Sequence, residues 1–163
     1  MRTYFLSVLI LSFCLFSCKS KKSMSDAPDT ASAISFTNIQ KAAYSGLENE
    51  ENLLINNAAD WAEFWSQANS NQSPTPERPD INFNVHVVLA ACMGTKNTGG
   101  HSIEIAETKI AGETVYASIV KSSPGPGCMS TMAITYPYHV IQIEKGNIKK
   151  AVFNVEERVD DCK

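Results

Sequence analysis

An almost uninterrupted apolar run constrains the fold of this chain more than any other feature. From Val85 to Ala91 the sequence reads "VHVVLAA", with His86 as its one polar member. A run of this length is typical of a strand that is covered on both faces. We therefore expect a strand here that other parts of the chain pack against from two sides.

The segments on either side of this run alternate between apolar and polar residues, as strands with one buried face do. Turn-forming residues between two pairs of these segments predict two β-hairpins. The acidic run Glu48–Glu51 predicts a turn ahead of a short strand. The expected strands are "ISFTNIQKAAYS", "NLLIN", the pair "HSIEIAET" and "TVYASIVKSS" around Ala111-Gly112-Glu113, and the pair "YHVIQIEK" and "IKKAVFNVEE" around Gly146-Asn147.

One segment, "AADWAEFWSQAN", has helical periodicity, with Asn57 or Asp60 as its N-cap. A polar, proline-rich loop follows at residues 70–81. The predicted fold class is therefore α+β, a single domain of mostly antiparallel β-sheet with one amphipathic helix packed against it. The helical face that we expect in the core carries Ala58, Trp61, Phe64, Trp65 and Ala68.

The N-terminus has the features of an export signal. Arg2 precedes an apolar core from Tyr4 to Phe16, which is shorter than the ~20 residues that a spanning helix needs. Leu15-Phe16-Ser17-Cys18 resembles a bacterial lipobox, which implies that acyl chains on Cys18 anchor the mature protein in a lipid bilayer. The alternative is an ordinary cleaved signal in which Cys18 has no role.

These observations divide the chain into three parts. Residues 1–17 are the expected lipoprotein signal peptide, residues 18–33 a flexible lipid-anchored tether, and residues 34–163 the folded domain. The expected location is the bacterial cell envelope, at the outer membrane, with the folded domain outside the cytoplasm. The net charge is −3 and no cluster of lysine and arginine lies outside the tether, so nucleic acid is not an expected partner.

Three cysteines lie in the folded domain, where an oxidising compartment favours a disulfide. The preferred pair is Cys128 with Cys162, which would tie the end of the chain to a proline-glycine loop. Cys92 lies in the apolar run and is expected to be a small buried hydrophobe. The sequence does not fix this pairing.

Neither catalysis nor metal binding is expected. Cys128 with His139 or His101 as base is conceivable, but no nucleophile signature surrounds the cysteine and a disulfide would disable it. The candidate metal ligands lack the pairs two to four residues apart that zinc sites use; they are His86, His101, His139, Cys92 and Cys128. We expect a protein that is not an enzyme and has no cofactor.

Three turn-rich motifs follow one another in the second half of the chain. Consecutive glycines permit a tight turn with positive φ, and alternating prolines and glycines make a stiff loop. Such a loop is either a brace between strands or a rigid binding edge. The motifs are Thr98-Gly99-Gly100, Pro124-Gly125-Pro126-Gly127 and Tyr136-Pro137-Tyr138-His139.

The longer stretches around these motifs are "MGTKNTGGHSIEI", "SSPGPGCMSTMAIT" and "YPYHVIQI". Together with "WAEFWSQ" and "DINFNVHVVLAACMG", they resemble the PrcB C-terminal domain family. The resemblance covers roughly Trp61 to Lys145. Cys92 departs from the bulky apolar residue expected there, and His101 from the usual aromatic residue. The family is named for a lipoprotein subunit that stabilises a surface protease complex. The resemblance thus implies a protease or other envelope protein as partner, bound through Lys96–Gly100, Ser123–Met129 and Tyr136–His139.

Two other functions remain open. A chagasin-like protease inhibitor also presents three loops, comparable to "NTGG", "PGPG" and "YPYH". The gap between the second and third motifs is short for that class, however, and a helix in the first half fits it poorly. The second alternative is a structural envelope lipoprotein that has no protease partner.

Overall fold

A computed structural model describes residues 27–162 of the chain. The predicted signal peptide, Cys18 and the first part of the tether lie outside the described residues. The described residues form eight strands and one helix: β1 Ser32–Ala33, β2 Phe36–Ala42, β3 Glu50–Ile55, α1 Ala58–Ala68, β4 His86–Met93, β5 Ser102–Ala111, β6 Thr114–Pro124, β7 Tyr138–Glu144 and β8 Lys150–Asp160.

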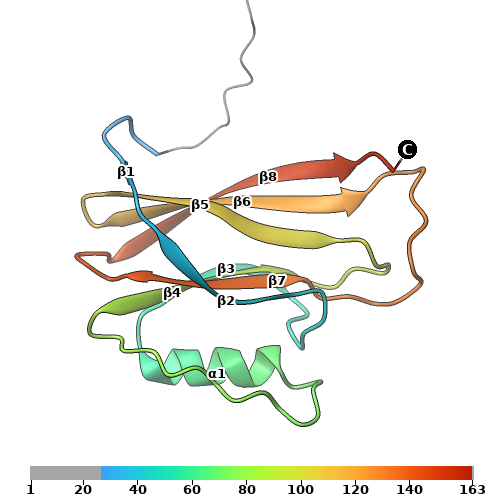
Figure 1. Cartoon of the computed structure of the whole chain (residues 1–163), viewed down its shortest axis with the longest axis horizontal. Coiled ribbons are helices and arrows are strands. Elements are labelled where there is room, and N and C mark those ends of the chain that lie inside the picture. The colour runs from blue at the N-terminus through green and yellow to red at the C-terminus, as the bar shows by residue number, and fades with distance from the viewer. Residues whose placement is uncertain (1–26, 163) are drawn as a thin grey trace, which may run out of the picture.

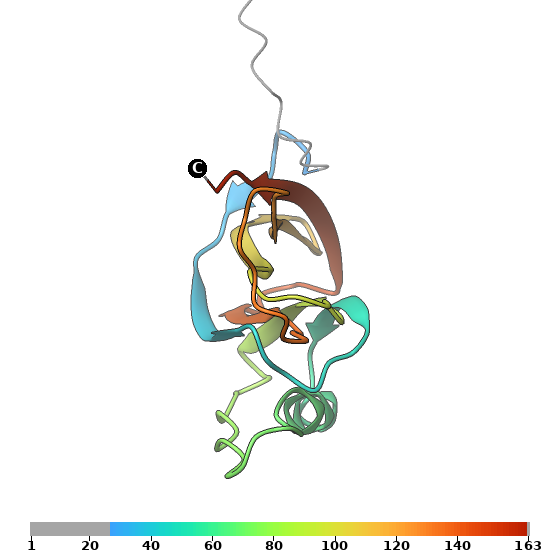
Figure 2. The same ribbon diagram turned by 90° about the vertical axis from the view of Figure 1, so that its right-hand side faces the viewer.

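These elements make three layers (Figure 1). The outer sheet has the strand order β1-β5-β6-β8, and the central sheet has the order β2-β7-β4-β3. Helix α1 covers the face of the central sheet that points away from the outer sheet (Figures 1 and 2). The prediction of mostly antiparallel strands with one helix is confirmed, but the strands divide between two sheets instead of forming one.

Strand β4 lies between the two other layers, which explains its apolar run. Val87, Leu89 and Ala91 point into the core between the two sheets, while Val88 and Cys92 point into the core beneath α1. All five side chains are fully buried. Because successive side chains of a strand alternate between its faces, a strand with a core on each side needs apolar residues at every position. The expectation for this segment is confirmed from His86 onward, whereas Val85 precedes β4 and is exposed.

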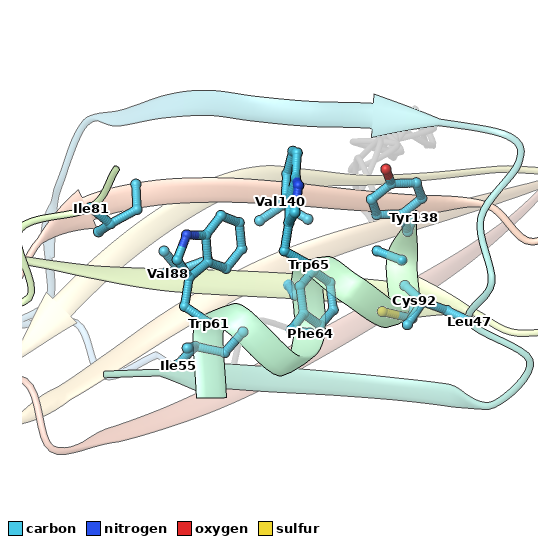
Figure 3. Packing of buried hydrophobic residues seen from close by; sticks show 12 residues of the cluster. Leu47, Ile55, Trp61, Phe64, Trp65, Ile81, Val88, Cys92, Tyr138 and Val140 are labelled. Carbon is cyan, nitrogen blue, oxygen red and sulfur yellow. The ribbon is translucent and has the colours of Figure 1, made fainter. Parts of the chain in front are cut away.

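Helix α1 forms where its periodicity predicted, although Ala58, which was expected in the core, is exposed. The Asn57 side chain caps it by accepting a hydrogen bond from the Asp60 amide at 2.9 Å. Trp61, Phe64 and Trp65 are buried against the central sheet (Figure 3). The two indole groups also donate hydrogen bonds to carbonyls of the proline-rich loop, at 3.0 and 3.1 Å. The tryptophans therefore serve the core and hold this loop against the helix.

The first predicted hairpin is confirmed and the second is wrong. Strands β5 and β6 pair antiparallel across Gly112, whose φ is +59°. Strands β7 and β8 do not pair; β7 lies in the central sheet, and β8 crosses to the outer sheet and pairs parallel with β6. The acidic run is also corrected in part, because Glu50 and Glu51 belong to β3.

The connection between β7 and β8 shows why no hairpin forms. Gly146, at φ +42°, starts a tight turn, but Ile148 then inserts into the core between the sheets. The amides of Lys149 and Lys150 both donate to the carbonyl of Glu113, in the β5–β6 turn. These contacts direct the chain into the outer sheet.

The N-terminal part of the described chain also crosses between the sheets. Ser32 and Ala33 pair with β5, so strand pairing starts two residues before the predicted domain boundary at residue 34. The chain then passes directly into β2 of the central sheet (Figure 2). Within residues 27–162, no helix is both long and apolar enough to cross a lipid bilayer.

Candidate functional site

Two long connections meet at one end of the molecule, which we call the loop end (right-hand side of Figure 1). They are residues 94–101, between β4 and β5, and residues 125–137, between β6 and β7. Lys96 and Thr135 exchange two backbone hydrogen bonds at 2.8 and 2.9 Å, and the Thr135 hydroxyl donates to the Thr98 carbonyl at 3.0 Å. The fold thus brings the three predicted motifs to the same end.

The glycine pair of the first motif allows close contact between the two connections. The Gly99 amide donates to the Thr131 carbonyl at 2.9 Å, and a side chain at Gly99 would place its Cβ 2.3 Å from the Thr131 hydroxyl. Gly100 has a φ of +84°, and a Cβ added there would lie 3.4 Å from the Pro124 ring. Of the two glycines in this motif, Gly100 is required for its positive φ. Gly99 is required because the neighbouring Thr131 leaves no room for a side chain.

The proline-glycine motif is held against the end of β8. The Gly125 amide donates to the Asp160 carbonyl at 3.0 Å, and a Cβ at Gly125 would lie 2.6 Å from that oxygen. Neither Gly125 nor Gly127 has positive φ, so conformational freedom is not the reason for these glycines. Close approach of two backbones requires glycine at Gly125, whereas a Cβ at Gly127 would meet nothing nearer than 3.9 Å.

A disulfide joins Cys128 to Cys162, the pair preferred from the sequence, with 5.0 Å between the two Cα atoms. It fastens the loop to the residues after β8. Cys92 is a free, fully buried thiol. Burial, with a smaller contribution from Glu51, raises the pKa of Cys92 to about 12. Cys128 is therefore no nucleophile, and Cys92 stays a protonated core residue.

The next residues of the same connection expose apolar side chains. Met129, Met132 and Ile134 have relative exposures of 104%, 97% and 54%. We call residues 129–134 the exposed apolar segment. Tyr44, which is 54% exposed, lies at the same end, since its neighbours Ala43 and Ser45 both bond to Tyr136.

Met132 and Ile134 lie outside the stretches that were predicted from the sequence to bind a partner. The available signal was "CMSTMAI", in which apolar side chains interrupt a short polar stretch beside a turn. Nothing in that pattern distinguishes an exposed methionine from a core one.

The structure divides the predicted partner-binding residues. Gly100, Pro126 and Gly127 are exposed, Thr98, Pro124 and Tyr136 are half-buried, and Gly99, Gly125, Pro137, Tyr138 and His139 are buried. The assignment of Tyr138 and His139 to a binding surface is therefore corrected. Both belong to β7, a strand in the middle of the central sheet, where the side chains point into the layers on either side.

Tyr138 and His139 have different surroundings. Tyr138 packs in the core beneath α1, and its hydroxyl has no hydrogen-bond partner among the described residues. His139 points toward the outer sheet, where its Nδ1 accepts a hydrogen bond from the Ile105 amide at 2.8 Å. Its Nε2 lies 2.8 Å from the Asn38 side-chain oxygen. Because Nδ1 accepts, the neutral ring carries its proton on Nε2 and donates it to Asn38.

This arrangement keeps His139 uncharged. Burial, together with the nearby Lys41 charge, lowers the pKa of His139 to about 4, against an opposing effect of Glu104. The Ile105 amide lies at an irregularity in the pairing of β5, between Ile105 and Glu107. His139 thus satisfies a backbone amide of the outer sheet from a strand of the central sheet.

His101 is the histidine of the loop end. Its ring nitrogens lie 3.2 Å from the Thr98 and Ser123 hydroxyls. Burial and the Lys96 charge lower the pKa of His101. A serine beside a histidine is a familiar nucleophile and base, but here the second ring nitrogen faces a threonine instead of an orienting carboxylate. The geometry supports a structural link between the first motif and β6.

The described residues contain no group of three or more histidine, cysteine, aspartate or glutamate side chains that could hold a metal ion. The five ligand candidates considered from the sequence are separated in the fold. Cys92 and His139 lie in different cores of the domain, and Cys128 is consumed by the disulfide.

Residues 87–144 match the family model described as PrcB C-terminal. This match confirms the resemblance that the sequence motifs indicated. It covers nearly all of β4 and extends through β7, and so includes both connections of the loop end. No curated protein and no solved structure matched the chain.

Proposed function

We propose that this protein is a lipid-anchored, non-enzymatic binding module of the bacterial cell envelope. Its loop end docks on a protease or protease complex and stabilises it. The observation that carries the proposal is the exposed apolar segment, whose two methionine side chains lie almost entirely in solvent beside a tightly fixed frame.

The frame holds both ends of the exposed apolar segment. On one side Cys128 is fixed by the disulfide, and on the other Thr135 is bonded to Lys96 and Thr98. Between them, Thr131 accepts a hydrogen bond from Gly99. A segment fixed in this way loses little conformational entropy when it binds, and methionine side chains adapt to the shape of a partner surface. Exposed apolar groups of this kind are typical of protein-binding sites.

The partner class and the location rest on the sequence. Residues 87–144 match the PrcB C-terminal family, and the resemblance of the sequence motifs to that family implies a partner in a protease complex. The lipobox-like stretch that ends at Cys18 supports a lipid anchor and export to the envelope. The candidate nucleophile Cys128 is in a disulfide and the candidate base His139 is buried, which supports a binding role over a catalytic one.

The chagasin-like inhibitor remains the second candidate, because loops from three motifs do meet at one end of a β-rich domain. The third motif, however, offers little surface for insertion into a protease. Tyr138 and His139 are buried, and Tyr136 is the half-exposed aromatic residue of that motif. An inhibitor would insert the loop end into a protease active site, whereas a stabilising subunit would leave the protease active.

Site-directed photocrosslinking in intact cells tests the proposal. A photoreactive residue is placed at Met129 in the full-length chain, and crosslinked proteins are identified by mass spectrometry. The matched control has the same photoreactive residue at Val85. This residue is 51% exposed and lies at the opposite end of the domain from the loop end, where its carbonyl accepts a hydrogen bond from the Lys145 amide. We expect a protease subunit to be captured from position 129 and not from position 85.

Capture of no protease, or equal capture from both positions, would contradict the proposal. If a protease is captured, its activity is measured with and without the purified protein. Unchanged activity and a longer lifetime support a stabilising subunit, and inhibition supports the chagasin-like alternative. A Cys18→Ser variant that remains on the membrane would overturn the lipid anchor.

A further inference from the structure

Strand β8 is the edge of the outer sheet, and its second side is free among the described residues (Figure 2). It is eleven residues long and pairs with β6 in one unbroken parallel register from Lys150 to Asp160. It contains no proline and no bulge. Long, regular edges of this kind are templates for pairing with another strand.

The direction of each backbone group of β8 follows from its pairing with β6. The Lys150 amide donates to Glu113, and the Asp160 carbonyl accepts from Gly125. In a parallel pair, alternate residues bond to the neighbour, so the even-numbered residues of β8 face β6. The odd-numbered residues direct their amides and carbonyls to the free side; they are Ala151, Phe153, Val155, Glu157 and Val159.

The other edges of the two sheets are less suited to pairing. Strand β1 has two residues, and the register of β2 shifts between Asn38 and Gln40. Strand β3 has six residues. Short strands and irregularities of this kind are the usual protection of a sheet edge. Strand β8 lacks both devices and exposes Val155 and Val159 at 42% and 67%.

We propose that β8 pairs antiparallel with β8 of a second copy of this chain, about a twofold axis at Val155. This pairing would join the outer sheets of the two copies into one continuous sheet. In this register Val155 faces Val155 of the second copy, and the free backbone groups of Phe153 and Ala151 face those of Glu157 and Val159.

The charges of β8 favour a second copy as the occupant and select the register. The strand begins with Lys150 and ends with Asp160, so an antiparallel pair centred on Val155 places these opposite charges across from each other at both ends. A shift of the centre to Glu156 would set two glutamates face to face, and a shift to Asn154 would set Lys150 against Arg158. Like charges directly opposite one another destabilise a strand pair.

Cysteine crosslinking of full-length chains tests this register. One copy carries Val152→Cys and the other Arg158→Cys, each with its own tag, and both are co-expressed and mildly oxidised. In the proposed pair these residues form a non-hydrogen-bonded pair with Cα atoms about 4.5 Å apart, within reach of a disulfide. Two copies of the same variant place their cysteines about 20 Å apart. We therefore expect a crosslinked dimer from the mixture and none from either variant alone.

Val155→Pro, introduced into both cysteine variants, is the disrupting change. The Val155 amide faces the free side, so proline there costs no bond to β6, while it removes the central bonds of the proposed pair. We expect the crosslink to disappear and the melting temperature to stay close to that of the parent. Glu156→Pro is the contrasting control, because it removes a bond to β6 and should lower the melting temperature.

Absence of a crosslink from the mixture would overturn the proposal, as would equal crosslinking by Val152→Cys alone. A crosslink that survives Val155→Pro in a folded chain would also overturn it. None of these readouts depends on a protease partner, so failure here is distinct from failure of the proposed docking at the loop end.

Discussion

The connection between β6 and β7 has two halves that differ in almost every physical respect. Residues 125–128 are fixed by the contact of Gly125 with Asp160 and by the Cys128–Cys162 disulfide. Residues 129–134 carry the exposed side chains of Met129, Met132 and Ile134. The difference indicates a division of labour, in which the proline-glycine motif supplies rigidity and the residues after it supply the contact surface.

Removal of the disulfide is the largest expected change to the fixed half. A Cys128→Ala/Cys162→Ala variant should lose about 3 kcal/mol of unfolding free energy, because a crosslink over 34 residues no longer restricts the unfolded chain. Urea titration followed by tryptophan fluorescence measures the loss. Wild-type protein under reducing conditions should match the variant, and a loss below about 1 kcal/mol would contradict the bracing role.

Acidification should weaken the fold through His139, a residue of the third motif that proved to be buried. The folded-state pKa is lowered to about 4, while the unfolded chain titrates near its ordinary value of 6.5. Between these values the unfolded chain binds a proton that the folded protein does not. Stability is therefore full above about pH 6.5 and falls as the pH drops toward 4, by at most about 3 kcal/mol.

A His139→Gln variant separates this effect from other titrations. It should be less stable than wild type at neutral pH, since it changes the group that accepts from Ile105, but its stability should change less between pH 6.5 and 4. The Lys41–Glu104 pair, which lowers the pKa of Glu104, is retained in the variant. Parallel pH profiles of the two proteins, measured by urea titration, would contradict the assignment.

Two glycines of one motif offer a sharper test of the same comparison. Gly125→Ala forces a Cβ against the Asp160 carbonyl and should cost about 1–3 kcal/mol. Gly127→Ala would place its Cβ at ordinary contact distance, 3.9 Å from the Cys162 carbonyl oxygen, and Gly127 has no positive φ, so the change should be neutral or stabilise by up to about 1 kcal/mol. Thermal unfolding of both variants checks the contrast, and equal losses would mean that the motif is not held through Gly125.

The smallest effect on stability is expected in the exposed half. A Met129→Ser/Met132→Ser variant should change the unfolding free energy by less than about 0.5 kcal/mol, because neither side chain is packed. The same variant should lose crosslinking to the partner from a probe placed at Ile134. A folded variant that still captures the partner at the wild-type level would show that the methionines are not the contact.

Local features of the fold were predictable from the sequence, and the pairing between distant segments was less so. The helical period of "AADWAEFWSQAN" and the cap at Asn57 act over a few neighbouring residues, so they predict the helix locally. The apolar run around Leu89 likewise predicts that β4 has a core on each side. The alternation of apolar and polar residues in "YHVIQIEK" and "IKKAVFNVEE" predicts only which side chains face the core. It does not identify the partner strand, and the docking of Lys149 and Lys150 on Glu113 overrides the turn signal at Gly146.

The sequence predicted where the candidate site lies better than it predicted which side chains the site exposes. Turn-forming residues marked the two connections that meet at the loop end, since glycine and proline are needed wherever the backbone turns or approaches another segment. The burial of Tyr138 and His139 was missed, because an aromatic residue after a proline reads equally well as surface or core. The exposure of Met132 was missed because an apolar residue in a short polar stretch can be either exposed or part of the core.

The way in which the chain alternates between the two sheets has a consequence for folding. The outer sheet takes its strands from both ends and the middle of the chain, and so does the central sheet, with crossings at β1–β2, β4–β5, β6–β7 and β7–β8. Neither sheet can be completed from a contiguous stretch of sequence, because β7 of the central sheet lies between β6 and β8 of the outer sheet along the chain. The domain should therefore fold slowly, as one cooperative unit, and a chain cut anywhere before β8 should yield no stable fragment.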